Sequence, residues 1–277
     1  MRYTQLPSGE QLPVLGLGTW HMGERPQKRQ DELDAIRCAI DNGMKLIDTA
    51  EMYGDGAAEE LIGQALGGRR SDAFIVSKVL PHHATRRGTV AACEDSLRRL
   101  RTDNLDMYLL HWPGAVPLDE TLEAFDALLQ AGKIRYWGVS NFDTPDMEEL
   151  LALRGGDAVA TNQVLYNLTR RGIEFDLMPW CRQRGLPVMS YSPLEQGRLL
   201  GDPALLRLAE EYSATPAQIA LRWVLRGDAA IAVPKAGTPE HVRQLRSALD
   251  IPLSRQDMAA LDRAFPPPKR KAPLEVI

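Results

Sequence analysis

The sequence is poor in cysteine, and the cysteines it has are not arranged for cross-linking or metal binding. Its 277 residues include three of them, Cys38, Cys93 and Cys181, which are far apart and form no CxxC pair. An odd number of scattered cysteines indicates neither a disulfide framework nor a zinc site. We predict buried, unreactive thiols and no bound metal.

Long hydrophobic runs and an excess of one charge are also missing. No segment approaches the roughly 20 apolar residues of a membrane span, and the start, MRYTQLPSGEQLPVLG, has no basic region followed by an apolar core. The 37 acidic and 33 basic residues give a formal net charge of −4 and are spread along the chain. Neither nucleic acid nor a membrane is favoured as a partner. We expect a cytoplasmic protein and, because no sustained exposed apolar stripe is legible, a monomer.

The sequence contains no linker rich in Gly or Ser, and no GxGxxG follows any apolar run. The segment GLGTW at 16–20 lacks the third glycine and the helix start of that dinucleotide-binding motif. Length alone allows one large α/β domain or two smaller ones. These absences disfavour two doubly wound domains and favour one domain over residues 1–277.

Short apolar runs recur along the chain and are separated by amphipathic segments with helical spacing, such as 31–43 and 57–68. The runs have the length and turn boundaries of buried strands; they cover 14–18, 45–48, 74–78, 106–111, 134–140, 158–163, 187–191 and 230–234. Two further short runs around Ser8-Gly9 predict an N-terminal β-hairpin. The pattern predicts a single (β/α)8 TIM barrel, with a C-terminal tail at 265–277.

Four polar residues of catalytic type stand near the ends of three of these runs. Asp48 ends the second run and Tyr53 follows it, Lys78 ends the third, and His111 ends the fourth. A lone polar residue at a strand end is usually a solvated rim residue. Four together predict one site, because the carboxyl ends of barrel strands meet at one face.

These four residue types can build a proton donor. A phenol with an ordinary pKa of about 10 keeps its proton at neutral pH, so Tyr53 is the candidate general acid. The ammonium of Lys78 would stabilise the phenolate, Asp48 would hold that lysine charged, and His111 would donate a hydrogen bond to a substrate carbonyl. Because none of these groups is redox-active, reduction would need a hydride from a cofactor.

Several motifs together resemble the aldo-keto reductase family. They are GLGTW, LIDTAEMYGDG, VSKV, LLHWPG, GKIRYWGVSNF, NQVLYN, YSPL and VPKAGTPEH, in the order and spacing of that family. The chain is most similar to the short bacterial members that reduce methylglyoxal and other small aldehydes. The resemblance implies NADPH as cofactor and the same four roles for Asp48, Tyr53, Lys78 and His111.

The resemblance also implies a set of cofactor contacts. Ser140, Asn141 and Gln163 would hold the nicotinamide carboxamide, and Tyr191 would stack on the nicotinamide ring. The loop over the pyrophosphate would begin with Ser192 and Leu194 and include Gly197 and Arg198. The remaining predicted contacts on the nicotinamide side are Thr19, Trp20 and Asp48.

The segment expected at the adenosine end departs from the family pattern. Lys235 matches the lysine that binds the 2′-phosphate, but His241 stands where the family has an arginine, and Ala236 replaces a serine. An arginine binds phosphate with two parallel hydrogen bonds, whereas a neutral histidine offers one donor. We expect NADPH, held by Lys235 and the helix start near Thr238, with a reduced preference over NADH.

The substrate pocket is expected to be shallow. Trp20 and Trp112 would form apolar walls beside Tyr53 and His111. The connection after His111 and the tail are both short, which predicts an open site for small aldehydes, α-oxoaldehydes and simple sugars. The tail's prolines are consistent with an extended segment over the barrel or with an untethered terminus.

Two other functions remain open at this point. The first is a non-catalytic NADP(H)-binding subunit that senses redox state or regulates a partner. The second is a metal-dependent barrel hydrolase in which Asp48 and His111 would be ligands. A metal is disfavoured because His21, His82 and His83 have no convincing ligand partners in the sequence.

Overall fold

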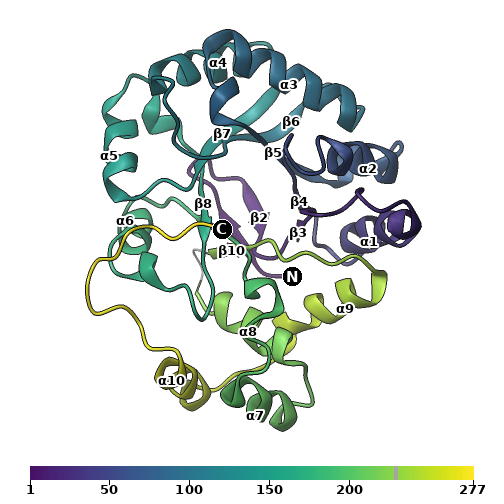
Figure 1. Ribbon diagram of the computed structural model, residues 1–277, viewed down its shortest axis with the longest axis vertical. Helices are drawn as coiled ribbons and strands as arrows, with labels where there is room; N and C mark the ends of the chain where they lie inside the picture. The colour runs from purple at the N-terminus through teal and green to yellow at the C-terminus, as the bar shows by residue number, and fades with distance from the viewer. Residues whose placement is uncertain (228–229) are drawn as a thin grey trace.

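Eight parallel strands run through the centre of the molecule and are surrounded by helices (Figure 1). The computed structural model describes residues 1–227 and 230–277. Each strand pairs in parallel with the next one along the chain. In chain order they are β3 (Leu17–Gly18), β4 (Leu46–Asp48), β5 (Phe74–Val79), β6 (Leu105–Leu110), β7 (Ile134–Ser140), β8 (Asn162–Leu165), β9 (Val188–Tyr191) and β10 (Ala230–Ala232).

The sheet closes on itself where the first and last strands meet. The backbone N–H of Gly16 donates to Ala232 O at 2.9 Å, and that of Gly18 donates to Pro234 O at 3.0 Å. A Cβ at Gly18 would lie 2.5 Å from the carbonyl oxygen of Val233, so only glycine permits this approach. The chain therefore forms the predicted (β/α)8 barrel.

Ten α-helices are found in the described part of the chain. They are α1 (Arg29–Asp41), α2 (Ala57–Leu66), α3 (Arg86–Leu100), α4 (Leu118–Gln130), α5 (Thr144–Ala152), α6 (Leu177–Gln183), α7 (Pro203–Glu211), α8 (Pro216–Val224), α9 (Pro239–Ser247) and α10 (Arg255–Ala264). Local signals explain several starts. In α8, Thr215 is the N-cap and forms a capping box with Gln218, Pro216 begins the helix, and Ile219 and Trp223 are buried. In the described ranges, no helix is long and apolar enough to cross a membrane.

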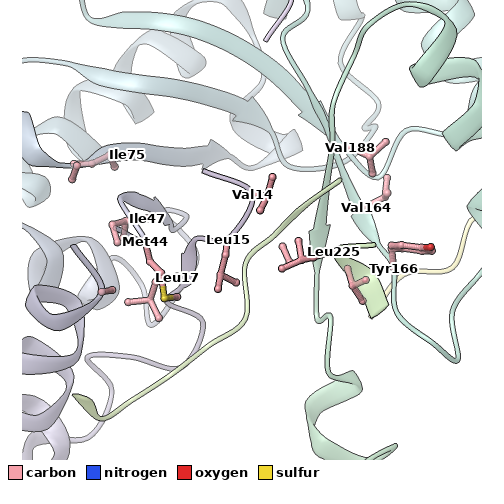
Figure 2. Close-up of a cluster of buried hydrophobic side chains, with 14 of the residues drawn as sticks. Val14, Leu15, Leu17, Met44, Ile47, Ile75, Val164, Tyr166, Val188 and Leu225 are labelled. Atoms are coloured by element: carbon pink, nitrogen blue, oxygen red, sulfur yellow. The ribbon is translucent and has the colours of Figure 1, made fainter. Parts of the chain in front are cut away.

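The core has two layers because strand side chains alternate between the two faces of the sheet. The larger layer lies between the barrel and its helices. Figure 2 shows part of it, including Leu17, Ile47 and Ile75 from successive strands. The smaller layer fills the barrel and includes Leu46, Val76, Met107, Leu109, Ala160, Met189 and Ile231.

The N-terminal hairpin closes one end of the barrel. Its antiparallel strands are β1 (Tyr3–Gln5) and β2 (Gln11–Pro13), joined through Gly9 with φ 93°. Leu6 and Leu12 pack against the interior layer, and Glu10 accepts a hydrogen bond from the Tyr136 hydroxyl at 2.7 Å. The predicted hairpin is thus confirmed, and it leaves the other end of the barrel for a site.

The tail lies over the barrel as an extended segment, which decides between the two alternatives left open by its prolines. It runs from α10 past α6 toward the centre of the barrel (Figure 1). Lys271 pairs with Asp176 at 3.0 Å, and Glu275 pairs with Arg170 at 2.5 Å. Ile277 reaches the lining of the central cavity.

Some sequence predictions were wrong in detail. The strand predicted at 158–163 is Asn162–Leu165, because Gly156–Ala158 form a 3-10 turn after the left-handed Gly155. The strand predicted at 14–18 is shorter in the structure, where only Leu17–Gly18 form a regular strand. Cys93 and Cys181 are buried as predicted, but Cys38 is only half-buried, between α1 and α9.

Candidate active site

A cavity of about 510 Å³ lies at the carboxyl ends of the barrel strands. Four polar side chains at strand ends line it, Asp48, His111, Ser140 and Tyr191, together with Gln163 from within β8. Barrels of this kind carry their sites on this face, because the loops after the strands converge there. The cavity coincides with the region where the sequence analysis placed the site.

Strand alternation explains why three of the predicted residues point inward. Asp48, Lys78 and His111 each follow an apolar residue of the barrel interior by two positions. Residues two apart on a strand share a face. The interior residues concerned are Leu46, Val76 and Leu109.

Lys78 is the centre of a buried polar cluster and has no exposed surface. Its Nζ donates to Asp48 Oδ1 at 2.8 Å and to Thr49 O at 2.7 Å, and lies 3.3 Å from Tyr53 Oη. Burial lowers the pKa of the Lys78 ammonium, while the charge and hydrogen bond of Asp48 oppose that shift. The cluster joins three of the four residues singled out from the sequence.

Tyr53 stands on the loop after β4 and lines the cavity. Burial of its hydroxyl, followed by the negative charge of Asp48, raises the pKa of the Tyr53 phenol well above the ordinary value of 10. The Lys78 ammonium acts in the opposite direction, because a positive charge 3.3 Å away stabilises the phenolate. The phenol therefore keeps its proton at neutral pH. The Lys78 ammonium is positioned to stabilise the negative phenolate that remains when Tyr53 gives up this proton.

His111 faces Tyr53 across the cavity, with the two rings edge-on and 6.0 Å between their centroids. Burial, and next the positive charge of Lys78, lowers the pKa of His111 to about 2. The ring is therefore a neutral imidazole, with one nitrogen that donates and one that accepts. Its Nδ1 is buried and finds no hydrogen-bond partner among the described residues.

The residues predicted to hold a carboxamide also line the cavity. Gln163 Nε2 donates to Asp48 Oδ1 at 2.7 Å, so this amide is tied to the Lys78 cluster. The hydroxyl of Tyr191 donates to Asn141 Oδ1 at 2.9 Å, and Ser140 Oγ donates to Gln163 O at 2.8 Å. The structure brings all four side chains to one side of the cavity.

The loop after β9 has an unusual backbone. Four of its residues adopt left-handed φ angles: Ser192, Glu195, Gln196 and Gly197. The side chain of Asn167 braces it by donating to Ser192 O at 2.9 Å and to Glu195 Oε2 at 2.8 Å. Such strain persists only where surrounding contacts enforce it.

Glu195 anchors that loop and was not recognised from the sequence. Its carboxylate is almost fully buried and accepts hydrogen bonds from Arg170 and Arg198, each at 3.0 Å. Ser192, Leu194 and Gly197, predicted to lie over a pyrophosphate, line the cavity, whereas Arg198 is held by Glu195 and does not line it.

The predicted adenosine-binding residues lie at and beyond one end of the cavity. Lys235 lines it and is exposed. Thr238 caps α9 through a 3.3 Å hydrogen bond from the backbone N–H of His241, whose side chain is exposed. Ala236 is buried beside them. Of the described residues that line the cavity, none is Ala236, Thr238 or His241.

The two predicted tryptophans stand at the cavity mouth. Trp20 is 38% exposed and Trp112 is 37% exposed, and both line the cavity. Thr19 is buried below it and donates from Oγ1 to Asp48 O at 2.9 Å. An apolar rim above a buried polar floor is typical of a site for a small ligand.

Several lining residues were not included in the predicted site. His21 follows Trp20 with a left-handed φ of 60°, and its Nδ1 lies 2.9 Å from Glu24 Oε1. Met52 precedes Tyr53, and Ile277 arrives from the tail. His21 and Met52 could have been found because each is adjacent in sequence to a predicted site residue. The sequence contains no comparable signal for Ile277.

Metal chemistry finds no support in the side-chain geometry. In residues 1–227 and 230–277, no three His, Cys, Asp or Glu side chains are grouped so that they could hold a metal ion. Asp48 is instead engaged by Lys78 and Gln163.

Comparison with known proteins agrees with this geometry. The sequence model described as the aldo/keto reductase family matches residues 14–265, nearly the whole chain. The chain belongs to this family. It is therefore an oxidoreductase of the aldo/keto reductase type.

Among curated aldo/keto reductases, methylglyoxal reductase YeaE of Escherichia coli (strain K12) is 49% identical over 271 residues, covering 96% of this chain and 95% of that protein. Glyoxal reductase of Bacillus subtilis (strain 168) is 35% identical and covers 93% and 91% of the two chains. Both similarities extend over almost the full length of the barrel.

A solved structure has almost the same fold. An aldo/keto reductase from Klebsiella pneumoniae, in complex with NADP and acetate, superposes with a TM-score of 0.97, and the two sequences are 51% identical. The match covers 99% of both chains. The likeness includes the tail as well as the barrel.

Proposed function

We propose that the protein reduces small aldehydes and α-oxoaldehydes such as methylglyoxal to alcohols with NADPH, and that Tyr53 is the general acid. The observation that carries the proposal is the buried contact of Lys78 with both Asp48 and Tyr53 at the floor of the cavity. A proton donor, a cation to stabilise its conjugate base and a counter-ion for that cation meet where a carbonyl can enter.

The cavity residues fit a dinucleotide. The amides of Asn141 and Gln163 offer the donors and acceptors that a carboxamide needs, and Tyr191 offers an aromatic ring beside them. Lys235 supplies a cation at the far end. Two similar structures from Klebsiella pneumoniae support NADP(H) as the cofactor, because they are complexes with NADP and with NADPH.

When bound, the nicotinamide would supply the hydride to the carbonyl carbon. Tyr53 would give its proton to the carbonyl oxygen, and solvent would later reprotonate the phenolate. Lys78 would stabilise that phenolate, and Asp48 would keep Lys78 charged and in place. His111, neutral because of its burial, would donate a hydrogen bond to the same oxygen as charge develops on it.

Small substrates suit the shape of the site. Trp20 and Trp112 are each more than one-third exposed, so the pocket between them is open to solvent. The curated relatives act on methylglyoxal and glyoxal according to their names. A compact dicarbonyl can reach Tyr53 and His111 without filling a deep channel.

The preference for NADPH over NADH should be modest. Lys235 is a point charge, and the exposed His241 stands where the family has an arginine. Arginine would add a bidentate grip on the 2′-phosphate that histidine cannot reproduce. We propose NADPH as the main cofactor, with measurable use of NADH.

The test is loss of NADPH absorbance by purified protein with a panel of carbonyls that includes methylglyoxal, glyoxal, a simple aldehyde and an aldose. We expect turnover with the small aldehydes, the same rate after treatment with a chelator, and slower turnover with NADH. Tight NADPH binding without turnover of any carbonyl would instead identify a redox-sensing or regulatory protein and overturn the proposal.

A further inference from the structure

A second buried carboxylate lies behind the Lys78 cluster, on the outer side of the barrel wall. Glu59 belongs to the first turn of α2 and has no exposed surface. Its Oε1 accepts a hydrogen bond from Ser77 Oγ at 2.6 Å, and its Oε2 accepts one from Arg99 Nε at 2.6 Å. Ser77 is the residue immediately before Lys78 on β5.

Glu59 lies in the mainly apolar layer between the barrel and its helices, where its charge also acts on the buried Cys93 thiol and Tyr108 hydroxyl. Leu61 and Ile62 of the same helix are fully buried, and so is Ile75 of β5. A carboxylate in such a layer costs free energy even when paired, and an apolar side chain of similar size would often be as stable. The position of this charge therefore calls for an account beyond packing.

Strand alternation sets the relation between Glu59 and Lys78. Ser77 points outward to Glu59 of α2 and Lys78 points inward to Asp48, so the Glu59 carboxylate and the Lys78 ammonium lie on opposite sides of the sheet. Interactions between charges reach further in a buried setting than in water. The negative charge of Glu59 acts to raise the pKa of Lys78, in the same direction as Asp48.

Few other charges face Lys78. Asp48 approaches from β4 and Tyr53 from the loop after β4. His111 approaches from β6 and is neutral. From the helices comes the Glu59 carboxylate, paired with Arg99 of α3. The charge of Glu59 also acts on Cys93 of α3 and Tyr108 of β6, which are neutral because burial raises the pKa of both, that of Cys93 to about 12. Glu59 and Arg99 are thus the charged pair behind the sheet.

We propose that Glu59 is a positioning residue for the reduction: its charge, held behind Ser77, keeps the Lys78 ammonium protonated beside Tyr53. This inference rests on the proposed function, because it takes Lys78 as the group that stabilises the Tyr53 phenolate. It adds a residue outside the cavity that controls the charge state of the donor pair.

Two opposite substitutions test the proposal. Glu59→Gln leaves Arg99 uncompensated, and Arg99→Met leaves Glu59 uncompensated, so the two change the potential at Lys78 in opposite directions. The alkaline limb of kcat/KM against pH should move to lower pH in Glu59→Gln and to higher pH in Arg99→Met. The shift in Glu59→Gln should be on the order of one pH unit, as a unit charge at about 10 Å produces for an effective dielectric constant of about 20. The shift in Arg99→Met should be smaller, because the charges that act on the pKa of Lys78 are those of Asp48 and Glu59.

Ser77→Ala is the matched control, because it removes the hydrogen bond to Glu59 and leaves both charges in place. Its alkaline limb should stay within a few tenths of a pH unit of that of the unsubstituted protein. If Glu59 only held the helix on the barrel, Glu59→Gln and Arg99→Met would both lower stability without shifting the limb. That result, or shifts of the same sign, would overturn the proposal.

A second readout separates this inference from the proposed function. The Lys78 side chain can be titrated by NMR in protein labelled with ¹³C-lysine, with Lys78→Met to assign its signal. The midpoint should fall in Glu59→Gln and rise in Arg99→Met, whether or not the protein turns over aldehydes. An unchanged midpoint in a folded variant refutes the role of Glu59, whereas absence of carbonyl-dependent NADPH oxidation refutes the function. If Glu59→Gln does not fold, the midpoint of Lys78 in Arg99→Met is still a test. A rise supports the role of Glu59, and an unchanged midpoint refutes it.

Discussion

The ammonium of Lys78 lies 2.8 Å from the carboxylate of Asp48, and their side chains are only 0% and 4% exposed. A buried ion pair of this kind is not in itself a source of stability, because both charges have been taken out of water. The pair does make the stability of the folded chain sensitive to the loss of either partner. Loss of one leaves a buried charge without compensation.

Asp48→Asn should therefore destabilise the protein more than an ordinary polar substitution. Breaking a buried pair by removing one partner costs about 3–5 kcal/mol. Urea unfolding at neutral pH would measure the loss, and steady-state turnover of methylglyoxal should fall in parallel. The double variant Asp48→Asn with Lys78→Met should recover part of the stability and none of the activity. Equal stability of the single and double variants would contradict this coupling.

His111 should make the protein sensitive to acid. Its pKa is lowered from 6.5 to about 2 in the folded chain, so between these values the unfolded chain binds a proton that the folded chain does not. Stability should then fall as the pH drops through this window, by about 1.4 kcal/mol per pH unit, and His111 should contribute no pH dependence above it. His111→Gln should flatten the slope between about pH 5 and about pH 6 in urea unfolding. An unchanged slope would show that His111 titrates normally.

Glu195 and Glu275 should differ in importance although both pair with Arg170. The side chain of Glu195 is 5% exposed and braces the strained loop after β9, whereas that of Glu275 is 42% exposed. Glu195→Gln should weaken NADPH binding several-fold, since the loop loses its anchor. Glu275→Gln should cost less than about 1 kcal/mol of stability, as exposed pairs do, and chiefly free the tail for proteolysis. Fluorescence titration with NADPH and limited proteolysis distinguish the two; equal NADPH affinity in both variants would contradict the assignment.

His241→Arg should sharpen the choice of cofactor. A guanidinium at this exposed first-turn position of α9 can form two hydrogen bonds to a 2′-phosphate, which predicts about a tenfold rise in the ratio of kcat/KM for NADPH over NADH. His241→Lys restores charge without the bidentate geometry and should give a smaller rise. If neither variant changes the ratio, the 2′-phosphate does not bind near α9.

The barrel and the floor of the site could be predicted because they follow from local periodicity. Apolar runs marked the strands, and alternation along them placed Asp48, Lys78 and His111 on the inner face. The register of parallel neighbours then brought these residues together. The family motifs supplied the cofactor contacts, whose roles remain proposals.

Features that depend on long-range contacts could not be predicted from the sequence. Ile277 enters the cavity because Lys271 and Glu275 hold the tail, and nothing in the tail's own sequence specifies those partners. Glu59 looked like an ordinary polar residue of an amphipathic helix, yet it is fully buried because Arg99 and Ser77 satisfy it. The strand predicted at 158–163 was misplaced because glycine turns reset its start.

The proposed reduction depends most on Tyr53 as the proton donor, and Tyr53→Phe tests this role directly. The substitution removes the hydroxyl 3.3 Å from Lys78 and keeps the ring. Turnover of methylglyoxal with NADPH should fall by about 10²- to 10⁴-fold, the usual contribution of a general acid, with NADPH affinity unchanged. Full activity in the phenylalanine variant would contradict the assignment.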